Sequence, residues 1–342
     1  MEPRRPRPEA ETRGEGAPAP CLPPPREYEF IETPAAKHPK PRKTEPRSQA
    51  MHRLLVCSLS TFLVTASLHA GDAEILAALK SKGAEITETK GVATGLAFSD
   101  CSKLTASDYA QIRQLASVKL LNFGKGFDDA ALKAVGAATG IEMLSTNGMD
   151  VSDEGVRALA EWKGLKSIAI FHPGKRLTGT GLAALASLPH LERLTVAGSL
   201  AFADEGMAAV ATITQLKNFR TWHSGVTAEG VKKIAALKNL TSINLGQRLS
   251  STPPVTLSDA ALPVLAELPL LEDIALQEAR LSVGALNKLK KLTHLKRLTL
   301  DGIDIPESDV AALKQQLPKT DVRWTAPTDA NKKRIEELFK TK

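Results

Sequence analysis

Cysteine and aromatic residues are scarce in this sequence of 342 residues. It contains three cysteines, and only 4% of its residues are aromatic. No apolar run reaches the roughly 20 residues that a membrane-spanning helix needs. A content of 42% hydrophobic and 24% charged residues is typical of a soluble globular protein. These figures exclude a membrane-embedded body and a wholly disordered chain.

Catalytic motifs are also missing from the sequence. We find no nucleophile elbow, no haem-attachment CxxCH and no cysteine or histidine pairs at metal-binding spacing. Gly174-Lys175-Arg176 lacks both the glycine run and the hydroxyl residue of a phosphate-binding loop. The sequence therefore predicts a protein that is not an enzyme and that carries no cofactor and no metal.

The first 50 residues differ in composition from the rest of the chain. They hold 12 of the 21 prolines and many charged side chains, but few apolar residues beyond Tyr28, Phe30 and Ile31. Such a segment cannot bury enough apolar surface to offset the conformational entropy that folding costs. We expect residues 1–50 to be a disordered segment rich in proline and arginine.

A different segment begins at Met51. Met51-His52-Arg53 is a short positive start, an apolar run follows from Leu54 to Val64, and the small residue Ala70 precedes Gly71. This order is typical of a secretory signal peptide, here over residues 51–70. A signal peptide does not act from behind 50 polar residues, so two interpretations are open. Either Met51 is the true start of the protein, or the apolar run is an internal anchor.

Export would restrict what the rest of the chain does. Of the three cysteines only Cys101 would remain after cleavage near Gly71, so no intramolecular disulfide could form even in an oxidising compartment. The remaining chain has only a small excess of basic residues, which is not the footprint of a nucleic-acid-binding protein. We expect a secreted, periplasmic or cell-envelope protein with no nucleic-acid partner and no stable membrane insertion of the mature chain.

Internal repeats dominate the sequence after residue 99. An L-x-x-L-x-L pattern recurs at intervals of 23 to 31 residues, and its starts are Val118, Ile141, Leu165, Leu191, Leu216, Leu240, Leu271 and Leu295. Fourteen residues before each start lies another apolar residue, namely Leu104, Phe127, Val151, Leu177, Phe202, Val226, Leu257 or Leu281. The same offset of fourteen residues in every unit indicates a true structural repeat.

The segment between the two apolar marks predicts a helix. In every repeat but one, which has Ala203, the residue after the first mark is of a type that caps helices: Thr105, Asp128, Ser152, Thr178, Thr227, Ser258 and Ser282. Apolar residues follow at helical spacing, as in Val156, Leu159 and Trp162. A small residue such as Gly155 stands just before each apolar triplet. We expect it to let the helix backbone approach the neighbouring layer.

Together these marks resemble the leucine-rich repeat, in the short-helix form common in exported bacterial proteins with repeats of about 24 residues. The start of the globular part resembles the cap of those proteins, with a helix from about Ala73 to Lys82 and a hairpin of 84–87 and 92–98. The sequence departs from the family after each strand, where Asn or Cys is replaced by Met149, Ser224, Ala279 or Ile303. This departure leaves the standard ladder that closes each turn without its usual residues.

The resemblance implies an α/β fold, a curved leucine-rich-repeat solenoid with a parallel β-sheet on the concave face and short helices on the convex face. Each repeat would contact only its neighbours. We expect an N-terminal cap at 71–98, repeats at 99–324 and a C-terminal helix and tail at 325–342. The segment from Ile305 to Trp324 would be a degenerate ninth repeat that closes the array.

Residues that alternate with the buried leucines point outward from the sheet and would meet a partner. In the central repeats these positions combine aromatic and basic side chains, and Trp and Arg are enriched in binding hot spots. The predicted ligand-binding residues of the concave face are Phe171, His172, Arg193, Arg220, Trp222, His223 and Asn244. In the other interpretation, Phe171 and Trp222 pack along the sheet and the two histidines are simply solvated.

Two further features concern the neighbourhood of these residues. His172 and His223 stand at equivalent positions two repeats apart, which puts about 10 Å between their backbones, too far for one shared metal ion. The longer repeats add residues after the strand, at 172–176, 198–201 and 246–256. All three insertions therefore lie on one edge of the solenoid, and such insertions often mark the binding side of a repeat array.

We expect a non-catalytic, exported leucine-rich-repeat protein that binds a protein or peptide, or an extracellular glycan, through its concave face. Two alternatives stay open. The chain is a structural component of an envelope or surface assembly, in which the convex helices and the caps carry the function. Or it is a hydrolase of envelope polymer, for which Asp273 and Glu278 are the nearest candidates for an acid and a base.

Overall fold

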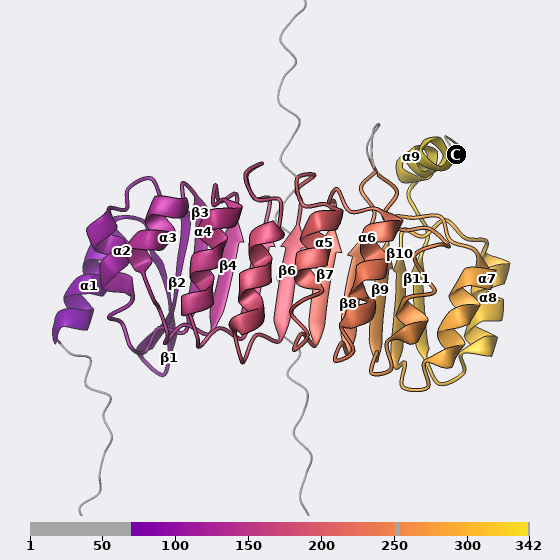
Figure 1. The fold of residues 1–342 in the computed structure, drawn as a ribbon, viewed down its shortest axis with the longest axis horizontal. Helices are drawn as coiled ribbons and strands as arrows, with labels where there is room; N and C mark the ends of the chain where they lie inside the picture. The colour runs from indigo at the N-terminus through magenta and orange to yellow at the C-terminus, as the bar shows by residue number, and fades with distance from the viewer. Residues whose placement is uncertain (1–69, 250–253, 341–342) are drawn as a thin grey trace, which may run out of the picture. The chain divides into compact units, whose positions relative to one another are not determined.

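The strands of this chain follow one another through a single sheet in sequence order. The computed structural model describes residues 70–249 and 254–340. Within these ranges eleven strands lie in the order β1 to β11, and helices cover one face of the sheet (Figure 1). The expected disordered segment and the expected signal peptide lie outside the described residues. The division of the chain into domains stays a prediction.

The described chain begins with a helix and a hairpin. Helix α1 (Ala70–Ser81) leads into strands β1 (Glu85–Thr89) and β2 (Val92–Asp100), which pair antiparallel. Lys90 and Gly91 both have positive φ in the tight turn between them, as a two-residue hairpin loop requires. The expected helix and hairpin are therefore present.

An ion pair joins this first segment to the first repeat. The ammonium of Lys82 lies 2.6 Å from Oδ2 of Asp108, a nearly buried carboxylate. Burial alone would raise the pKa of Asp108, but hydrogen bonds from Lys82 and Thr105 outweigh burial and hold the pKa below its ordinary value. Asp108 also completes a capping box with Thr105 at the start of the next helix.

All later strands are parallel and in register. They are β3 (Leu120–Lys125), β4 (Met143–Asn147), β5 (Ser167–Phe171), β6 (Arg193–Ala197), β7 (Asn218–Trp222), β8 (Ser242–Gly246), β9 (Asp273–Gln277), β10 (Arg297–Asp301) and β11 (Asp321–Thr325). One residue of each strand joins a single buried row that runs through the molecule: Leu121, Leu144, Ile168, Leu194, Phe219, Ile243, Ile274, Leu298 and Val322. The predicted apolar marks thus form a continuous core.

Short helices cover the other side of this core. The α-helices are α2 (Ala106–Ile112), α3 (Asp129–Val135), α4 (Asp153–Arg157), α5 (Asp204–Val210), α6 (Ala228–Lys232), α7 (Val283–Leu286), α8 (Glu307–Gln316) and α9 (Asp329–Lys340). Segments of 3-10 helix extend or replace them at 158–161, 180–187, 233–236, 265–267 and 287–291. This arrangement is the expected leucine-rich-repeat solenoid, with a parallel sheet on one side and short helices on the other.

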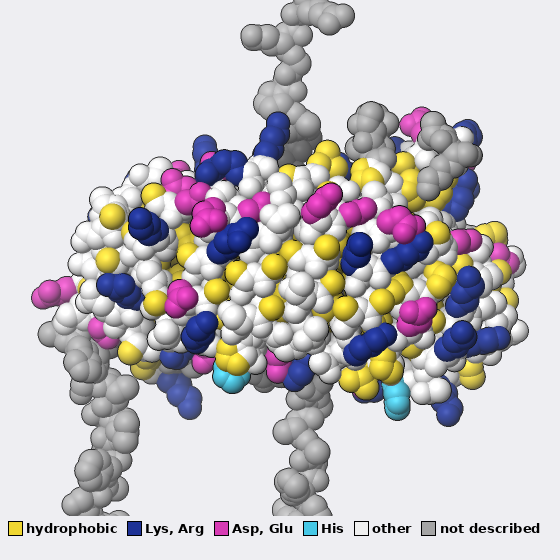
Figure 2. All heavy atoms as spheres, in the orientation of Figure 1, with side chains coloured by type: hydrophobic (Ala, Val, Ile, Leu, Met, Phe, Trp, Pro, Cys, Tyr) yellow, Lys and Arg dark blue, Asp and Glu magenta, His cyan; other side chains and the backbone are white. Residues whose placement is uncertain are grey.

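Charges on the helix face follow the direction of the helices. Acidic residues occupy the first turn of α4, α5, α6 and α8, where the helix dipole favours negative charge. In Figure 2 the acidic side chains gather mainly along the upper part of this face, and basic side chains lie both at its upper edge and below them. The mixed signs make this face an ordinary solvated surface.

The predicted helix caps form in most repeats. The side chains of Thr105, Asp128, Ser152, Thr227 and Ser282 accept a hydrogen bond from a backbone N–H in the first helical turn. Ala203, the expected exception, makes no side-chain cap.

The predictions at Thr178 and Ser258 are wrong. Gly179, in the left-handed conformation, starts the helical segment after Thr178, and the N–H of Gly181 donates to the Asp153 carboxylate instead of the Thr178 hydroxyl. After Ser258 no helix begins before Leu265. The reason is Pro263, whose missing N–H and fixed ring disfavour a helix through that segment.

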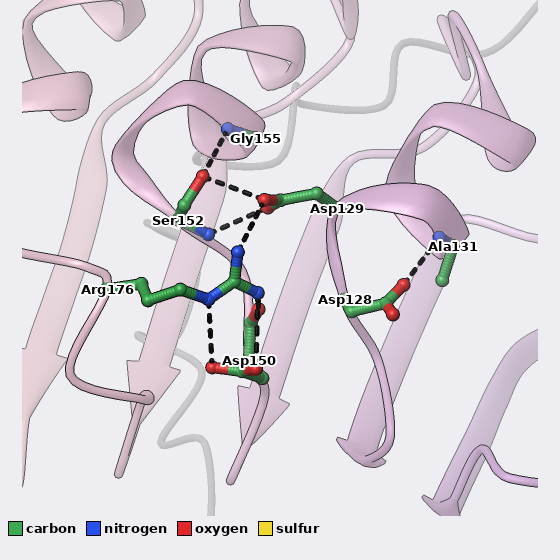
Figure 3. A network of polar contacts seen from close by, with 7 residues as sticks. All are labelled: Asp128, Asp129, Ala131, Asp150, Ser152, Gly155 and Arg176. Atoms are coloured by element: carbon green, nitrogen blue, oxygen red, sulfur yellow. Dashed lines mark hydrogen bonds and ion pairs between the residues drawn. The ribbon is translucent and has the colours of Figure 1, made fainter.

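An aspartate just after the cap position ties successive repeats together. The carboxylates of Asp129, Asp153, Asp204 and Asp259 accept from the backbone N–H of the cap residue in the next repeat, at 2.7 to 2.9 Å. The first three also accept the hydroxyl of that residue, for example Ser152 Oγ at 2.8 Å from Asp129 (Figure 3). We call these four carboxylates the aspartate rungs.

The aspartate rungs close the turns that the family's usual residue does not. Met149, Ser224, Ala279 and Ile303 occupy that usual position and are all buried. A rung is also absent where the residues that would form it are absent. Gly179 stands where a rung aspartate would be, and Ala203 in the following repeat lacks the matching hydroxyl. The rung carboxylate and the hydroxyl that would donate to it are therefore missing together.

The small residues near the helix starts make room for the rungs. A Cβ added at Gly155 would lie 1.9 Å from Oδ1 of Asp129, and one at Gly230 would lie 2.0 Å from Oδ1 of Asp204. At Gly181 an added Cβ would lie 2.0 Å from the carbonyl oxygen of Asp153. The expectation that a small residue lets adjacent layers approach is confirmed.

Arg176 belongs to this edge of the solenoid as well. Its guanidinium lies between Asp129 and Asp150, with Nη1 at 3.1 Å from Oδ2 of Asp129 and Nη2 at 3.1 Å from Oδ2 of Asp150 (Figure 3). Hydrogen bonding to Asp150 raises the pKa of Arg176. The Gly174-Lys175-Arg176 sequence thus carries an ion-pair network.

The last helix returns to the sheet. In α9, Ile335 and Leu338 are buried. Asn331 at its start donates from Nδ2 to Oε1 of Glu278, just after β9, over 3.4 Å. Figure 1 shows α9 beside the end of the sheet, apart from α7 and α8. This places α9 near the outward residues that follow the strands.

Candidate functional site

The predicted ligand-binding residues occupy adjacent strands of the sheet. Phe171 ends β5, Arg193 starts β6, Arg220 and Trp222 lie on β7, and Asn244 lies on β8. His172 and His223 directly follow β5 and β7. We call these seven residues, which the parallel register brings onto one face, the central sheet face. Whether they bind a ligand stays a prediction.

Phe171 and Trp222 form an aromatic pair across two strands. Their ring centroids lie 6.0 Å apart with planes tilted by 48°. Ala197 of β6 stands between them in register and is only 2% exposed. On the other side of Trp222, a Cβ at Gly246 would lie 2.5 Å from the Trp222 Cβ. Small neighbours therefore leave the two rings room to lie over the sheet.

Both rings stay half-exposed. Their mutual contact agrees with the interpretation in which they pack along the sheet. That interpretation does not account for the aromatic surface that still faces solvent in a chain poor in aromatic residues. Such a surface suits an apolar side chain of a ligand.

The two central arginines have no acidic partner among the described residues. Arg193 and Arg220 are exposed, and neither guanidinium makes an ion pair or a side-chain hydrogen bond within residues 70–249 and 254–340. Further along the same face, Arg297 lies 3.2 Å from Asp273 and Arg323 lies 2.7 Å from Asp321. The sheet thus pairs its arginines at one end and leaves them unpaired at the centre.

A row of left-handed residues follows the strands. The chain leaves β4, β6 and β10 through Gly148, Gly198 and Gly302, all with positive φ. At the equivalent positions His172, His223 and Glu278 have φ of 47°, 52° and 58°. A side chain in this conformation costs on the order of 1 kcal/mol, so glycine is the favoured residue. Three repeats nevertheless carry a polar side chain there.

These three side chains do not gather around one point. His172 Nδ1 lies 3.0 Å from Oδ1 of Asn147, whereas His223 Nε2 lies 3.0 Å from Oε2 of Glu278. The two histidines therefore have separate partners, as their expected spacing required. Glu278 is held between His223 and Asn331 of α9.

The acid–base pair of the hydrolase alternative does not form. Asp273 begins β9 and Glu278 follows its end, so about 16 Å of extended strand separates their backbones. Asp273 pairs with Arg297, and Glu278 contacts His223. Two carboxyl groups that cleave a glycosidic bond lie much closer than this. Asp273 and Glu278 are not such a pair.

Two residues near the central sheet face behave differently from their neighbours. Oδ1 of Asn244 is buried and lacks a hydrogen-bond partner in the described chain, beside Arg220 in the register. Gln247 directly follows β8, as His172 and His223 follow β5 and β7, but it is buried. Its amide accepts from the N–H of Thr256 at 2.8 Å and donates to the carbonyl of Pro254 at 2.9 Å, which closes the long insertion.

Two open cavities lie away from this face. One of about 240 Å³ lies between α2 and α3, with Cys101 and Tyr109 in its wall. Burial raises the pKa of both Cys101 and Tyr109 above their ordinary values, so neither is an activated nucleophile. The other, of about 670 Å³, lies beside α9, and its lining residues Arg280 and Asp304 form an ion pair.

The described residues contain no group of three or more His, Cys, Asp or Glu side chains placed to hold a metal ion. Across 70–249 and 254–340, none of the helices has both the length and the apolar character needed to cross a bilayer.

Solved structures similar to this chain are leucine-rich-repeat proteins. The complex of TLR13 with ssRNA13 matches 65% of this chain at 14% identity and a TM-score of 0.40. The plant peptide hormone receptor RGFR1 in complex with RGF2 matches 67% at 13% identity and a TM-score of 0.33. The matches cover 31% and 44% of those chains, so this chain corresponds to less than half of each. No family model and no curated protein matches the sequence.

Proposed function

We propose that this chain is a non-catalytic, exported leucine-rich-repeat protein that binds a protein or peptide through its central sheet face. The observation that carries the proposal is the half-exposed pair of Phe171 and Trp222, flanked by the unpaired guanidiniums of Arg193 and Arg220. Aromatic and arginine side chains that are available on one surface are typical anchors of protein interfaces.

The left-handed residues support the same location. Glycine would relieve the backbone strain at His172 and His223, and it is present at three equivalent positions, Gly148, Gly198 and Gly302. Residues that keep strained backbone conformations cluster at functional sites. Export rests on the signal-peptide pattern that begins at Met51.

Peptide selection tests the proposal. A displayed library of random 12-residue peptides is selected on the full wild-type chain and on the double variant Phe171→Ala/Trp222→Ala. We expect the wild type to enrich a family of peptides and the double variant to lose it. The matched control is Leu270→Ala, because this leucine is 46% exposed but lies off the central sheet face.

The outcomes separate the binding role from the structural alternative. Binding through this face requires that the control variant retains the peptides while the aromatic variant loses them at an unchanged melting temperature. If wild type and both variants enrich nothing, or enrich the same peptides equally, the central sheet face does not bind peptides. An assembly role through helices and caps would then be favoured.

A further inference from the structure

We infer that the ligand of the central sheet face is an extended acidic peptide segment, in which two carboxylates precede an apolar side chain at alternate positions. This inference rests on the proposed function and specifies its ligand. It follows from which charges on the sheet are paired and from how the unpaired groups are spaced.

Charge pairing distinguishes the two arginines from the others on the sheet. Arg297 and Arg323 each have a carboxylate within 3.2 Å, on the neighbouring strand or on their own. Arg193 has Ser167 and Asn218 as register neighbours, and Arg220 has Thr195 and Asn244, so neither has a carboxylate beside it. A guanidinium binds carboxylate through two parallel N–H···O bonds. Two unpaired guanidiniums on one face therefore complement an anionic ligand.

The backbone register sets the spacing of the three anchor positions. Arg193 is in register with Asn218, and Arg220 lies two residues further along β7. One strand spacing and two residues separate Arg193 from Arg220, which is about 8 Å. Trp222 is two residues beyond Arg220 on the same face of β7, about 7 Å away.

An extended peptide has the same spacing between alternate side chains. Residues i, i+2 and i+4 of a strand lie on one face about 7 Å apart. A segment with Asp or Glu at two alternate positions and an apolar residue at the next can place its carboxylates at Arg193 and Arg220 and its apolar side chain at Trp222 and Phe171. The Asn244 amide, next to Arg220 in register, is within the same surface.

The rest of the sheet argues against a nucleic acid as the ligand. Beyond β8 the outward side chains include Asp273, Glu278, Asp301 and Asp321. Three of them contact His223, Arg297 or Arg323, so this end of the sheet carries mixed charge, whereas binding of single strands needs a continuous basic groove. A short acidic peptide needs only the two central arginines.

Selection with charge variants tests the inference. The peptides selected on the full wild-type chain are sequenced, and their binding is measured for Arg193→Ala/Arg220→Ala and for the control Arg297→Ala/Arg323→Ala, whose arginines are already paired. We expect Asp and Glu to be enriched at alternate positions before an apolar residue. Loss of the central arginines should weaken these peptides at least tenfold, and the control should change their affinity less than threefold.

A charge reversal makes the test specific. Arg193→Glu/Arg220→Glu should select peptides with Lys or Arg in place of Asp and Glu, because the aromatic anchors remain. Raising the salt concentration from 50 to 500 mM should weaken wild-type binding, because the ion pairs between the peptide carboxylates and the two arginines would be exposed to solvent. Unchanged melting temperatures establish that each variant is folded.

Failure of this inference and failure of the proposed function give different results. Wild-type peptides without acidic enrichment that still depend on Phe171 and Trp222 would overturn the acidic ligand and retain peptide binding. An empty selection would overturn both. Tighter binding of a single-stranded oligonucleotide than of any selected peptide would also overturn the inference, and would assign the arginines to phosphate.

Discussion

Charged groups at the edge where the helices begin have partners within the chain, whereas the two arginines of the central sheet face have none among the described residues. On the helix edge each aspartate rung accepts hydrogen bonds from the next repeat, and Arg176 lies between two carboxylates. On the central sheet face Arg193 and Arg220 have no partner and two aromatic rings stay half-exposed. Polar groups that hold the repeats together have partners within the chain, and the two guanidiniums at the sheet centre have none among the described residues.

This difference separates groups that stabilise the fold from groups available to a ligand. A carboxylate that accepts several backbone N–H groups contributes to stability, because its loss leaves those donors without partners. An exposed and unpaired arginine contributes almost nothing to stability. Substitutions at the two places should therefore have opposite profiles of stability and binding.

The largest loss of stability is expected at Asp153. Its carboxylate accepts hydrogen bonds from the backbone of Thr178, Gly179 and Gly181 and from the Thr178 hydroxyl. Asp153→Ala should lower the free energy of unfolding by about 3 kcal/mol, since donors near the core lose a charged acceptor. Denaturant unfolding measures this. The neighbouring Glu154, which is exposed and pairs with Arg157, is the control, and Glu154→Ala should change stability by less than about 0.5 kcal/mol.

A slightly smaller effect is expected where a glycine allows two repeats to approach. Gly181→Ala should destabilise the protein by about 2 kcal/mol, because its Cβ would lie 2.0 Å from the Asp153 carbonyl oxygen and force the layers apart. At Gly284 the nearest atom would be 3.7 Å from an added Cβ. Gly284→Ala should be neutral or stabilising, since alanine favours the helix. Equal melting temperatures for the two variants would contradict the close approach.

The pH dependence of stability gives a smaller but directional effect. Burial alone would raise the pKa of Asp153, but its hydrogen bonds from Thr178, Gly181 and Gly179 hold the pKa below its ordinary value. The unfolded chain therefore takes up this proton first. The contribution of Asp153 is complete above the unfolded pKa and is lost as the pH falls from about 5 toward 2. Wild type should lose more stability over this range than Asp153→Ala, and parallel curves would contradict the shift.

The smallest effect is expected at the left-handed histidine His172. Glycine would remove backbone strain but lose the contact with Asn147 and add freedom to the unfolded chain. His172→Gly should therefore leave the unfolding free energy within about 1 kcal/mol of wild type. A loss larger than this, seen by denaturant unfolding, would mean that His172 serves the fold and not a ligand.

Sequence periodicity was sufficient to predict the repeats but not the side-chain contacts that join one repeat to the next. Buried leucines, small residues and most caps repeat at one offset, so they could be predicted at positions such as Gly155 and Ser152. The aspartate rungs were missed, although an aspartate follows the cap position in four repeats. Their partner is in the next repeat, about 25 residues away, and no pattern within one repeat reveals such a contact.

Exceptions to the repeat were the least predictable part. Gln247 fits the outward pattern, but an insertion that needs its backbone hydrogen bonds satisfied draws the amide inward. Thr178 fits the cap pattern, but the N–H groups of Gly179 and Gly181 donate to the Asp153 carboxylate and not to the Thr178 hydroxyl. The outward direction of Arg193 and Arg220 followed from the alternation of side chains along a β-strand. That they lack partners depends on the residues of the adjacent strands, and only the structure shows it.

The most direct test compares affinity and stability in the same variant. The strongest peptide selected on wild type is titrated by calorimetry into wild type and Arg220→Ala, and both proteins are melted under the same conditions. The account predicts at least tenfold weaker binding of the peptide with a melting temperature that is unchanged. Equal affinity, or a loss of binding that is matched by a loss of stability, would contradict the claim that the unpaired charges of the central sheet face exist for a ligand.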